Sequence, residues 1–213
     1  MTDIASIRKD YTQQTLSETE VYSEPYSQFT KWWNEAVASD IDEVNAMTLA
    51  TASADGIPSA RIVLLKGYDE NGFVFFTNYQ SYKARQIAEN PRASLLFFWK
   101  ELERQVRIDG LIEKVSDAES DDYFFSRPEG SKIGAWASPQ SHVIAGREWL
   151  EQKVEEVKAL FGNKEIKRPS HWGGYRVRAV GFEFWQGRSS RLHDRVQYTL
   201  QENGSWLIER LAP

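Results

Sequence analysis

The chain of 213 residues contains no cysteine and only three histidines. Without a thiol it can form neither disulfides nor iron–sulfur clusters, and thiolate catalysis is excluded. The three histidines, at positions 142, 171 and 193, are not spaced as metal ligands, so we predict no metal site. The lack of cysteine also suits a reducing compartment such as the cytoplasm.

Long hydrophobic runs are also lacking. One of the longest, Ser94–Trp99, is far too short to span a bilayer. The polar first fourteen residues have no apolar segment of the kind that a secretory signal needs. We therefore expect a soluble, cytoplasmic protein that does not associate with membranes.

The net charge of −5 is unevenly distributed, because residues 1–56 carry ten acidic and only three basic side chains. With 41% hydrophobic and 27% charged residues, the composition is that of an ordinary globular protein. The sequence has no clustered basic face, which argues against nucleic acid as a partner. The composition still allows a few local clusters of basic residues that bind small anions.

The pattern of short, β-rich segments predicts a mainly β protein with peripheral α-helices, arranged as an antiparallel barrel. Turn signals such as Ala54–Gly56 and Asp69–Gly72 separate these segments. No dinucleotide-binding glycine fingerprint and no phosphate-binding Walker loop occurs. The predicted strands are 46–52, 59–68, 72–78, 92–100, 104–116, 175–187, 191–200 and 205–213, and the predicted helices are 3–11, 28–39, 82–89, 117–126 and 146–161.

Two segments combine basic residues with features of a binding site. In a regular strand Arg61 and Lys66 would point to opposite faces, either toward ligands or simply toward solvent. Tyr123 and Arg127 share a helix face at a spacing of four, and Ser131 could cap the next helical turn. A phenol, a guanidinium, a hydroxyl and helix amides suit a phosphate, although an ordinary surface helix end would carry similar residues.

The segment Arg191–Arg195 has the strongest site character. Strand alternation would put Arg191, His193 and Arg195 on one face, where their charges repel unless an anion or an electron-rich ring lies against them. An exposed edge strand, protected from aggregation by charge, is the alternative. Gln140 and Ser141 lie in a polar loop that offers hydrogen-bond donors, as many loops without ligands do.

Several motifs together are typical of a known family. They are Arg61–Lys66, Leu102–Val106, Ser126–Pro128, Ile133–Trp136, Trp172–Gly174, Phe184–Gly187, Arg191–Arg195 and the ending Arg210–Pro213. On these motifs the chain resembles the pyridoxamine/pyridoxine 5′-phosphate oxidase family over nearly its whole length.

This resemblance implies a flavin mononucleotide (FMN)-binding split barrel, an antiparallel barrel of Greek-key type, over residues 28–213. Residues 1–27 would form an N-terminal helix and a flexible lid. The resemblance further implies a homodimer with FMN at the subunit interface. The reaction would oxidise pyridoxine 5′-phosphate or pyridoxamine 5′-phosphate to pyridoxal 5′-phosphate. O₂ would be the acceptor, and hydrogen peroxide, with ammonia from the amine, would be released.

The resemblance also assigns roles to individual residues. The FMN contacts would be Arg61, Ile62, Val63, Leu64, Leu65, Lys66, Phe76, Thr77, Lys83, Gln105, Gln140, Ser141, Trp185 and Arg195; Arg61, Lys83, Gln140 and Ser141 among them would hold the FMN phosphate. Lys66, Tyr123, Arg127 and Ser131 would bind the substrate phosphate. Arg191 and His193 would act as catalytic residues at the pyridine ring, under a lid carrying Arg8 and Tyr11.

The chain departs from the family pattern at two positions. Tyr82 stands where the family usually has an arginine, which removes one cation expected near the FMN phosphate, and Phe76 replaces a usual tyrosine. Two other functions stay open. One is a different flavin oxidoreductase on the same barrel, which would lack the set of substrate residues. The other is a non-catalytic carrier of flavin or pyridoxal phosphate.

Overall fold

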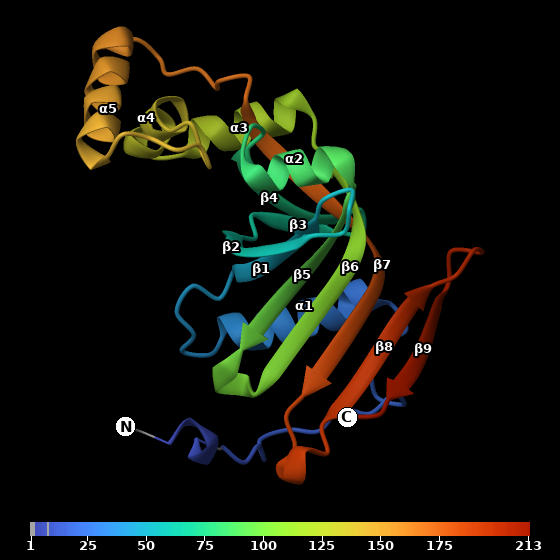
Figure 1. Ribbon diagram of the computed structural model, residues 1–213. Helices are drawn as coiled ribbons and strands as arrows, with labels where there is room; N and C mark the ends of the chain where they lie inside the picture. The colour runs from blue at the N-terminus through green and yellow to red at the C-terminus, as the bar shows by residue number, and fades with distance from the viewer. Residues whose placement is uncertain (1–2, 8) are drawn as a thin grey trace. The chain divides into compact units, whose positions relative to one another are not determined.

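The structure is a computed structural model that describes residues 3–7 and 9–213 (Figure 1). It is mainly β, as predicted, with α-helices attached. The strands are β1 (Ala46–Ala52), β2 (Pro58–Leu64), β3 (Gly67–Asp69), β4 (Gly72–Asn78), β5 (Arg92–Trp99), β6 (Arg104–Lys114), β7 (Trp172–Gln186), β8 (Asp194–Leu200) and β9 (Trp206–Leu211). The α-helices are α1 (Pro25–Val37), α2 (Tyr82–Glu89), α3 (Asp117–Ser126), α4 (Glu129–Ala137) and α5 (Arg147–Phe161).

The strands form one sheet in the order β2-β1-β5-β6-β7-β4-β3, and β8 joins β7 to β9. The pairs β3–β4, β4–β7, β7–β8 and β8–β9 are antiparallel. The chain divides into two compact units, and strands β1, β5, β6 and β7 contribute residues to both. The first unit comprises Met1–Leu49, Ser94–Gly110 and Ala179–Pro213; the second comprises Ala50–Ala93 and Leu111–Arg178.

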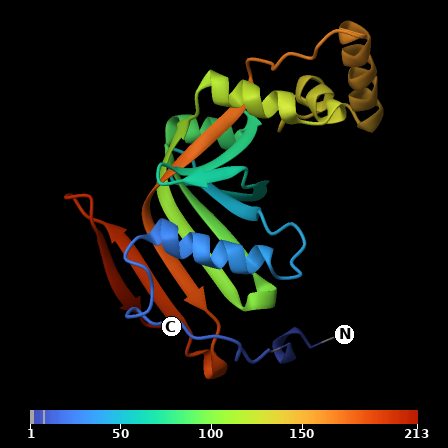
Figure 2. The ribbon, with the colours of Figure 1, turned by 180° about the vertical axis from the view of Figure 1, so that it is seen from behind.

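The core of the first unit is aromatic. Helix α1 begins with Pro25, whose fixed φ suits a first helical position, three residues earlier than predicted. The ring centroid of Phe29 in this helix lies 5.4 Å from that of Phe97. The rings of Trp32 and Phe184 pack edge to face, with 5.3 Å between their centroids. Figure 2 shows α1 lying across the strands of this unit. Helix α1 therefore buries Phe29, Trp32 and Ala36, which share one helix face, in this core.

In the second unit, α3, α4 and β7 enclose a core of Phe124, Ile133, Ile166 and Trp172. Helix α4, which the sequence pattern did not predict, buries Ile133 and Ala137 at a spacing of four. Its segment contains two glycines, which weaken a helix and obscured the pattern. Figure 1 places α5 beside α4. Packing rather than local propensity thus stabilises α4.

Two predicted elements near the ends of the chain are wrong. The helix predicted over residues 3–11 is only a 3₁₀ turn, Ile4–Ser6, capped by the side chain of Asp3. Residue 8, which belongs to this prediction, lies outside the described residues. The strand predicted from Arg191 begins only at Asp194, because Ser190 and Arg191 have φ values of 55° and 61°. The predicted alternation of Arg191, His193 and Arg195 on one strand face is therefore also wrong.

Candidate functional site

A cavity of about 510 Å³ in the second unit brings together most of the residues predicted to bind phosphates. We call it the basic cavity. The predicted residues that line it are Arg61, Ile62, Val63, Leu64, Lys66, Phe76, Thr77, Lys83, Tyr123, Arg127, Ser131 and Gln140; Asn78, Pro128 and Trp172 line it as well. Leu65 is instead buried in the core, and the exposed Ser141 does not line the cavity.

A break in the predicted strand 59–68 explains how Arg61 and Lys66 reach one cavity. Strand β2 ends at Leu64 and β3 begins at Gly67. Between them the backbone N–H of Lys66 donates to the carbonyl of Val74 at 2.8 Å. The prediction that the two side chains point to opposite faces is wrong, because the break ends the regular alternation.

Arg61 is held in place by residues that the sequence did not identify as part of a site. Its Nη1 donates to Thr51 Oγ1 at 2.6 Å and to the carbonyl of Ser59 at 3.2 Å. Thr51 in turn donates to Gln86 Oε1 at 2.6 Å, and both side chains are buried. Burial lowers the pKa of Arg61. No sequence motif identifies Thr51 or Gln86 as site residues, because their role in orienting Arg61 arises only when the chain has folded.

Lys83 lies next to this arginine. Its Nζ donates to Gln140 Oε1 at 3.0 Å and to Thr77 Oγ1 at 3.2 Å. Burial, together with the nearby charge of Arg61, lowers the pKa of Lys83 to about 8. Two partly desolvated cations that face each other are costly without an anion. An anionic group would relieve this cost and fits the donors present.

Three nearly parallel aromatic rings form one wall of the basic cavity. Phe76 stacks on Tyr123 at 4.0 Å and on Trp172 at 5.6 Å between ring centroids. Gly174 makes room for this arrangement, because a Cβ there would lie 2.8 Å from the Phe76 ring and 2.6 Å from Val115. Packing of the aromatic rings therefore explains the glycine in the Trp172–Gly174 motif. This motif was also the feature of the sequence that could have identified Trp172 as a cavity residue.

Arg127 follows the end of α3 and lies over Trp172, with 4.4 Å between its guanidinium and the ring centroid. Its Nη1 is buried and has no hydrogen-bond partner within residues 3–7 and 9–213. Burial lowers the pKa of Arg127. A buried donor of this kind is costly unless a ligand accepts from it.

Ser131 lies in the first turn of α4, where Pro128 occupies the N-cap position. The backbone N–H of Ser131 donates to the carbonyl of Pro128 at 2.9 Å. The prediction that Ser131 caps the helix is therefore wrong. Its side chain nevertheless lines the basic cavity.

A separate cavity of about 470 Å³ lies in the first unit and contains the predicted catalytic residues Arg191 and His193. Tyr11 also lines it, with its ring centroid 6.1 Å from that of His193. Gly187 permits this approach, because a Cβ there would lie 2.7 Å from the Tyr11 ring. The predicted lid residue Arg8 lies outside the described residues.

The surroundings of His193 favour its neutral form. Burial, and then the charge of Arg191, lowers the pKa of His193 below its ordinary value. Its Nδ1 accepts a hydrogen bond from the backbone N–H of Arg188 at 3.1 Å. In the neutral ring the proton therefore resides on Nε2, so this nitrogen is a hydrogen-bond donor.

The remaining predicted FMN contacts, Gln105, Trp185 and Arg195, belong to the first unit. Trp185 lies 4.5 Å from His193 between ring centroids. Arg195 donates from Nε to Glu183 Oε1 at 2.7 Å and from Nη1 to the carbonyl of Ala212 at 2.8 Å. The carbonyl of Ala212, in the C-terminal motif Arg210–Pro213, thus helps to orient Arg195.

Neither a metal cluster nor a membrane helix is found in the part of the chain that the structure describes. Within it no three His, Asp or Glu residues gather as ligands for a metal ion. No described helix combines the length and the apolar character that crossing a bilayer requires.

Comparison with known proteins decides the family. One sequence profile, described as "Pyridoxamine 5′-phosphate oxidase", matches residues 33–161. A second, "Pyridoxine 5′-phosphate oxidase C-terminal dimerisation region", matches residues 172–213. The chain belongs to the pyridoxamine 5′-phosphate oxidase family. This result confirms the predicted family and makes the protein an oxidoreductase.

Similar proteins support this assignment over the full chain. The chain is 60% identical to a pyridoxine/pyridoxamine 5′-phosphate oxidase of Trichormus variabilis, over 99% of this chain and 98% of the relative. It is 57% identical to the protein of the same name in Cupriavidus necator, over 100% of both chains.

Solved structures confirm the predicted split-barrel fold. PhzG from Burkholderia lata, solved with tetrahydrophenazine-1-carboxylic acid, matches with a TM-score of 0.89 and 31% identity, over 96% of this chain and 100% of that one. A pyridoxamine 5′-phosphate oxidase-related, FMN-binding protein from Nostoc punctiforme matches with a TM-score of 0.69, over 91% of this chain and 100% of that one. At 17% identity, the second likeness supports the fold alone.

Proposed function

We propose that the protein is an FMN-dependent oxidase that converts pyridoxine 5′-phosphate or pyridoxamine 5′-phosphate to pyridoxal 5′-phosphate. The observation that carries this proposal is the basic cavity. Arg61 and Lys83 form one cationic pair there, and Lys66 and Arg127 supply two further cations beside Tyr123 and Ser131. Two phosphorylated ligands, a cofactor and a substrate, would account for both sets of donors.

The residues present fit an FMN phosphate. Arg61, Lys83, Gln140 and the neighbouring Ser141 would hold it, since the first two are partly desolvated cations beside polar donors. The volume of about 510 Å³ is in the range of cofactor and ligand pockets. Residues 62–64, Lys66 and the pair Phe76-Thr77 would contact the rest of the flavin, together with Gln105, Trp185 and Arg195.

Bound FMN would supply the two-electron chemistry: the substrate would lose a hydride from C4′ and a proton from its hydroxyl or amino group, and O₂, as final acceptor, would take up both and become hydrogen peroxide. For the amine, water then releases ammonia. The chain contributes binding and orientation. Lys66, Tyr123, Arg127 and Ser131 would bind the substrate phosphate, and this would fix the pyridine ring relative to the reacting atoms.

Arg191 and His193 would contact the pyridine ring. Because Nδ1 of His193 accepts from the backbone of Arg188, the ring would donate from Nε2 to an oxygen of the substrate. The guanidinium of Arg191 would help to hold C4′ at a near-attack position for hydride transfer. Tyr11 would cover this cavity as part of the predicted lid formed by residues 1–27.

We also propose a homodimer with FMN at the subunit interface. This is supported by the match of residues 172–213 to a profile described as a dimerisation region. The cytoplasmic location remains a prediction from the sequence.

The pH dependence of FMN binding tests the role of Lys83. Only the ammonium form of Lys83 attracts the phosphate, and its pKa in the free protein is about 8. The FMN phosphate remains dianionic above about pH 6. We therefore expect the Kd of FMN to rise with pH above about pH 8, by at most about tenfold per pH unit, and to level off where Arg61, Gln140 and Ser141 hold the phosphate without Lys83. Quenching of flavin fluorescence on titration of the apoprotein measures this Kd.

Lys83→Arg is the matched control, because a guanidinium stays protonated throughout this range. Its Kd should depend only weakly on pH. An equally steep rise in both proteins would assign the effect to another group and would count against Lys83 as a phosphate ligand.

The half-reaction without oxygen tests the proposed function directly. Protein loaded with FMN is mixed under argon with pyridoxine 5′-phosphate, and the flavin absorbance near 450 nm reports its redox state. We expect bleaching, followed by recovery in air with release of pyridoxal 5′-phosphate.

Failure of both pyridoxine 5′-phosphate and pyridoxamine 5′-phosphate to bleach bound flavin would contradict the proposal. Reduction by a nicotinamide donor alone would then favour another flavin oxidoreductase. Binding of pyridoxal 5′-phosphate without any turnover would favour a carrier.

A further inference from the structure

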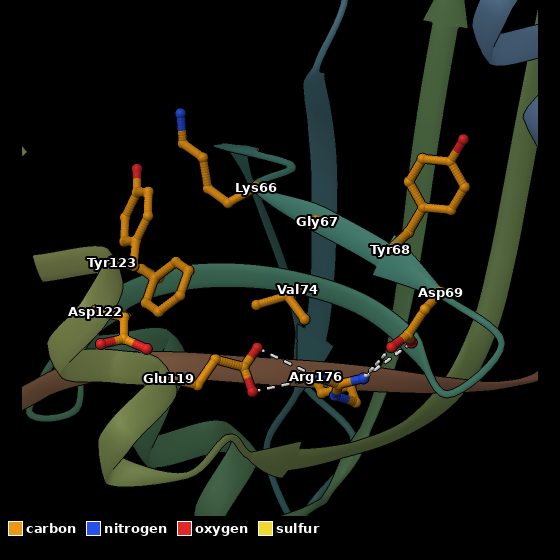
Figure 3. A pocket seen from close by; sticks show the side chains of 10 residues that line it. Lys66, Gly67, Tyr68, Asp69, Val74, Glu119, Asp122, Tyr123 and Arg176 are labelled. Carbon is orange, nitrogen blue, oxygen red and sulfur yellow. Dashed lines mark hydrogen bonds and ion pairs between the residues drawn. The ribbon is translucent and has the colours of Figure 1, made fainter. Parts of the chain in front are cut away.

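The second unit contains another cavity, of about 480 Å³, besides the basic cavity (Figure 3). The two cavities share Lys66, Phe76 and Tyr123. Its other walls are acidic, with carboxylates from Asp69, Glu119 and Asp122 among the lining residues. Negative charge so close to Lys66 opposes binding of a phosphate, so its compensation bears directly on the proposed function.

Arg176, on β7, compensates two of these carboxylates. Its Nη1 donates to both carboxylate oxygens of Asp69, at 2.9 and 3.2 Å, and its Nη2 to both of Glu119, at 3.2 and 3.3 Å. The Arg176 side chain is 18% exposed. Figure 3 shows it between the two acids, with Lys66 extending away from them.

The two carboxylates belong to the elements that carry phosphate-binding residues. Glu119 and Tyr123 lie four residues apart on α3, and Asp69 ends the short strand that follows Lys66. Val74 pairs with Gly67 on one side and with Arg176 on the other. The arginine is thus fixed by the sheet two strands away from the segment that holds Lys66.

Loss of the Arg176 charge would leave the carboxylates uncompensated. Burial alone would raise the pKa of Asp69, but hydrogen bonds from Asn71 and Arg176 outweigh it and hold this pKa below its ordinary value. Charges that are closer together than a Debye length, about 8 Å at physiological ionic strength, are only partly screened. Free carboxylates would attract the Lys66 ammonium and repel a phosphate dianion.

We propose that Arg176 is a positioning residue for phosphate recognition: by binding Asp69 and Glu119 it keeps Lys66 available for the substrate phosphate. This inference rests on the proposed function, in which Lys66 binds that phosphate. Arg176 would act through the two carboxylates and would not contact the substrate.

The variant Arg176→Met tests this role. We expect KM for pyridoxine 5′-phosphate to rise about tenfold, the order expected for one uncompensated charge near a partly exposed site. Turnover at saturation and the Kd of FMN should stay near the wild-type values. Calorimetric titration with pyridoxal 5′-phosphate should give the same loss of affinity without turnover. Arg178→Met is the matched control, because Arg178 lies on the same strand and its side chain is 57% exposed. This substitution should change neither KM for pyridoxine 5′-phosphate nor the Kd of FMN.

Neutralising the two carboxylates separates the electrostatic effect of losing Arg176 from its effect on the structure. In Arg176→Met combined with Asp69→Asn and Glu119→Gln, affinity should return to within a few-fold of wild type, because the two carboxylates that Arg176 compensates are then neutral. If this variant stays as weak as Arg176→Met, or if Arg176→Met binds normally, the proposal is overturned.

The proposed function can fail separately. Wild-type protein that binds pyridoxal 5′-phosphate but never oxidises a substrate would contradict the oxidase, while the calorimetric comparison would still decide the role of Arg176. Wild-type protein that binds no phosphorylated pyridine would contradict both.

Discussion

Replacing Arg191 by alanine should lower kcat about 100-fold or more, while the FMN content of the purified protein stays unchanged. The expected size is that of losing one oriented group at a reacting centre. Arg191 lines the cavity of the first unit beside His193 and is absent from the basic cavity that would hold the FMN phosphate. Steady-state kinetics and the ratio of flavin to protein absorbance measure the two quantities.

Backbone effects should not complicate this variant. Arg191 has a φ of 61°, and arginine and alanine both carry a Cβ, so the substitution does not change the kind of strain at this position. Leu192→Ala is the neighbouring control, since Leu192 is 69% exposed and should leave kcat within about twofold. Equal losses of turnover and of FMN from Arg191→Ala would defeat the catalytic role.

Replacing Arg127 by methionine should raise KM for pyridoxine 5′-phosphate by about 100-fold. A charged hydrogen bond in a desolvated site contributes roughly 2–5 kcal/mol to binding. The buried Nη1 of Arg127 has no acceptor among the described residues, and a substrate phosphate would supply one. Methionine retains an unbranched side chain that can pack on Trp172.

The same variant should not lose stability in the absence of ligands. The buried Nη1 of Arg127 lacks an acceptor among the described residues, and removing such a donor also removes its desolvation cost. We expect the Tm of the apoprotein to rise by about 2–4 °C, as for a gain of roughly 1 kcal/mol in a chain of this size. Differential scanning calorimetry measures it. A fall in Tm together with an unchanged KM would make Arg127 a structural residue.

Lys132→Met serves as the control for Arg127. Lys132 is also a cation near the start of α4, but it is not among the residues that line the basic cavity. Its KM should stay within about twofold of wild type.

Much of the local structure could be predicted from the sequence, because its signals act over a few residues. Helix α3 begins after Ser116, whose side chain caps it, and ends before Pro128, within the predicted bounds. Helix α2 likewise ends before Pro91. The Asn203-Gly204 turn joins β8 to β9, with Gly204 at a φ of 83°. Motifs such as Trp172–Gly174 were sufficient to predict the family that the comparisons then confirmed.

Other features depend on residues far apart in the chain. The break between β2 and β3 places Lys66 in the same cavity as Arg127, and the left-handed backbone at Arg191 removes the predicted strand face. Helix α4 exists because the core accepts Ile133, although its own residues favour helix only weakly. None of these outcomes follows from periodicity, because each is fixed by packing.

The sequence alone thus determined the family, the strand-rich class and most of the residues that line the basic cavity. Only the tertiary structure decided the electrostatic state of those residues. Three features arise from folding: the desolvation of Lys83, the donor of Arg127 that lacks an acceptor among the described residues, and the bridge from Arg176 to Asp69 and Glu119. Burial and pairing of charge depend on neighbours brought together across the sheet, and a linear pattern carries no measure of either.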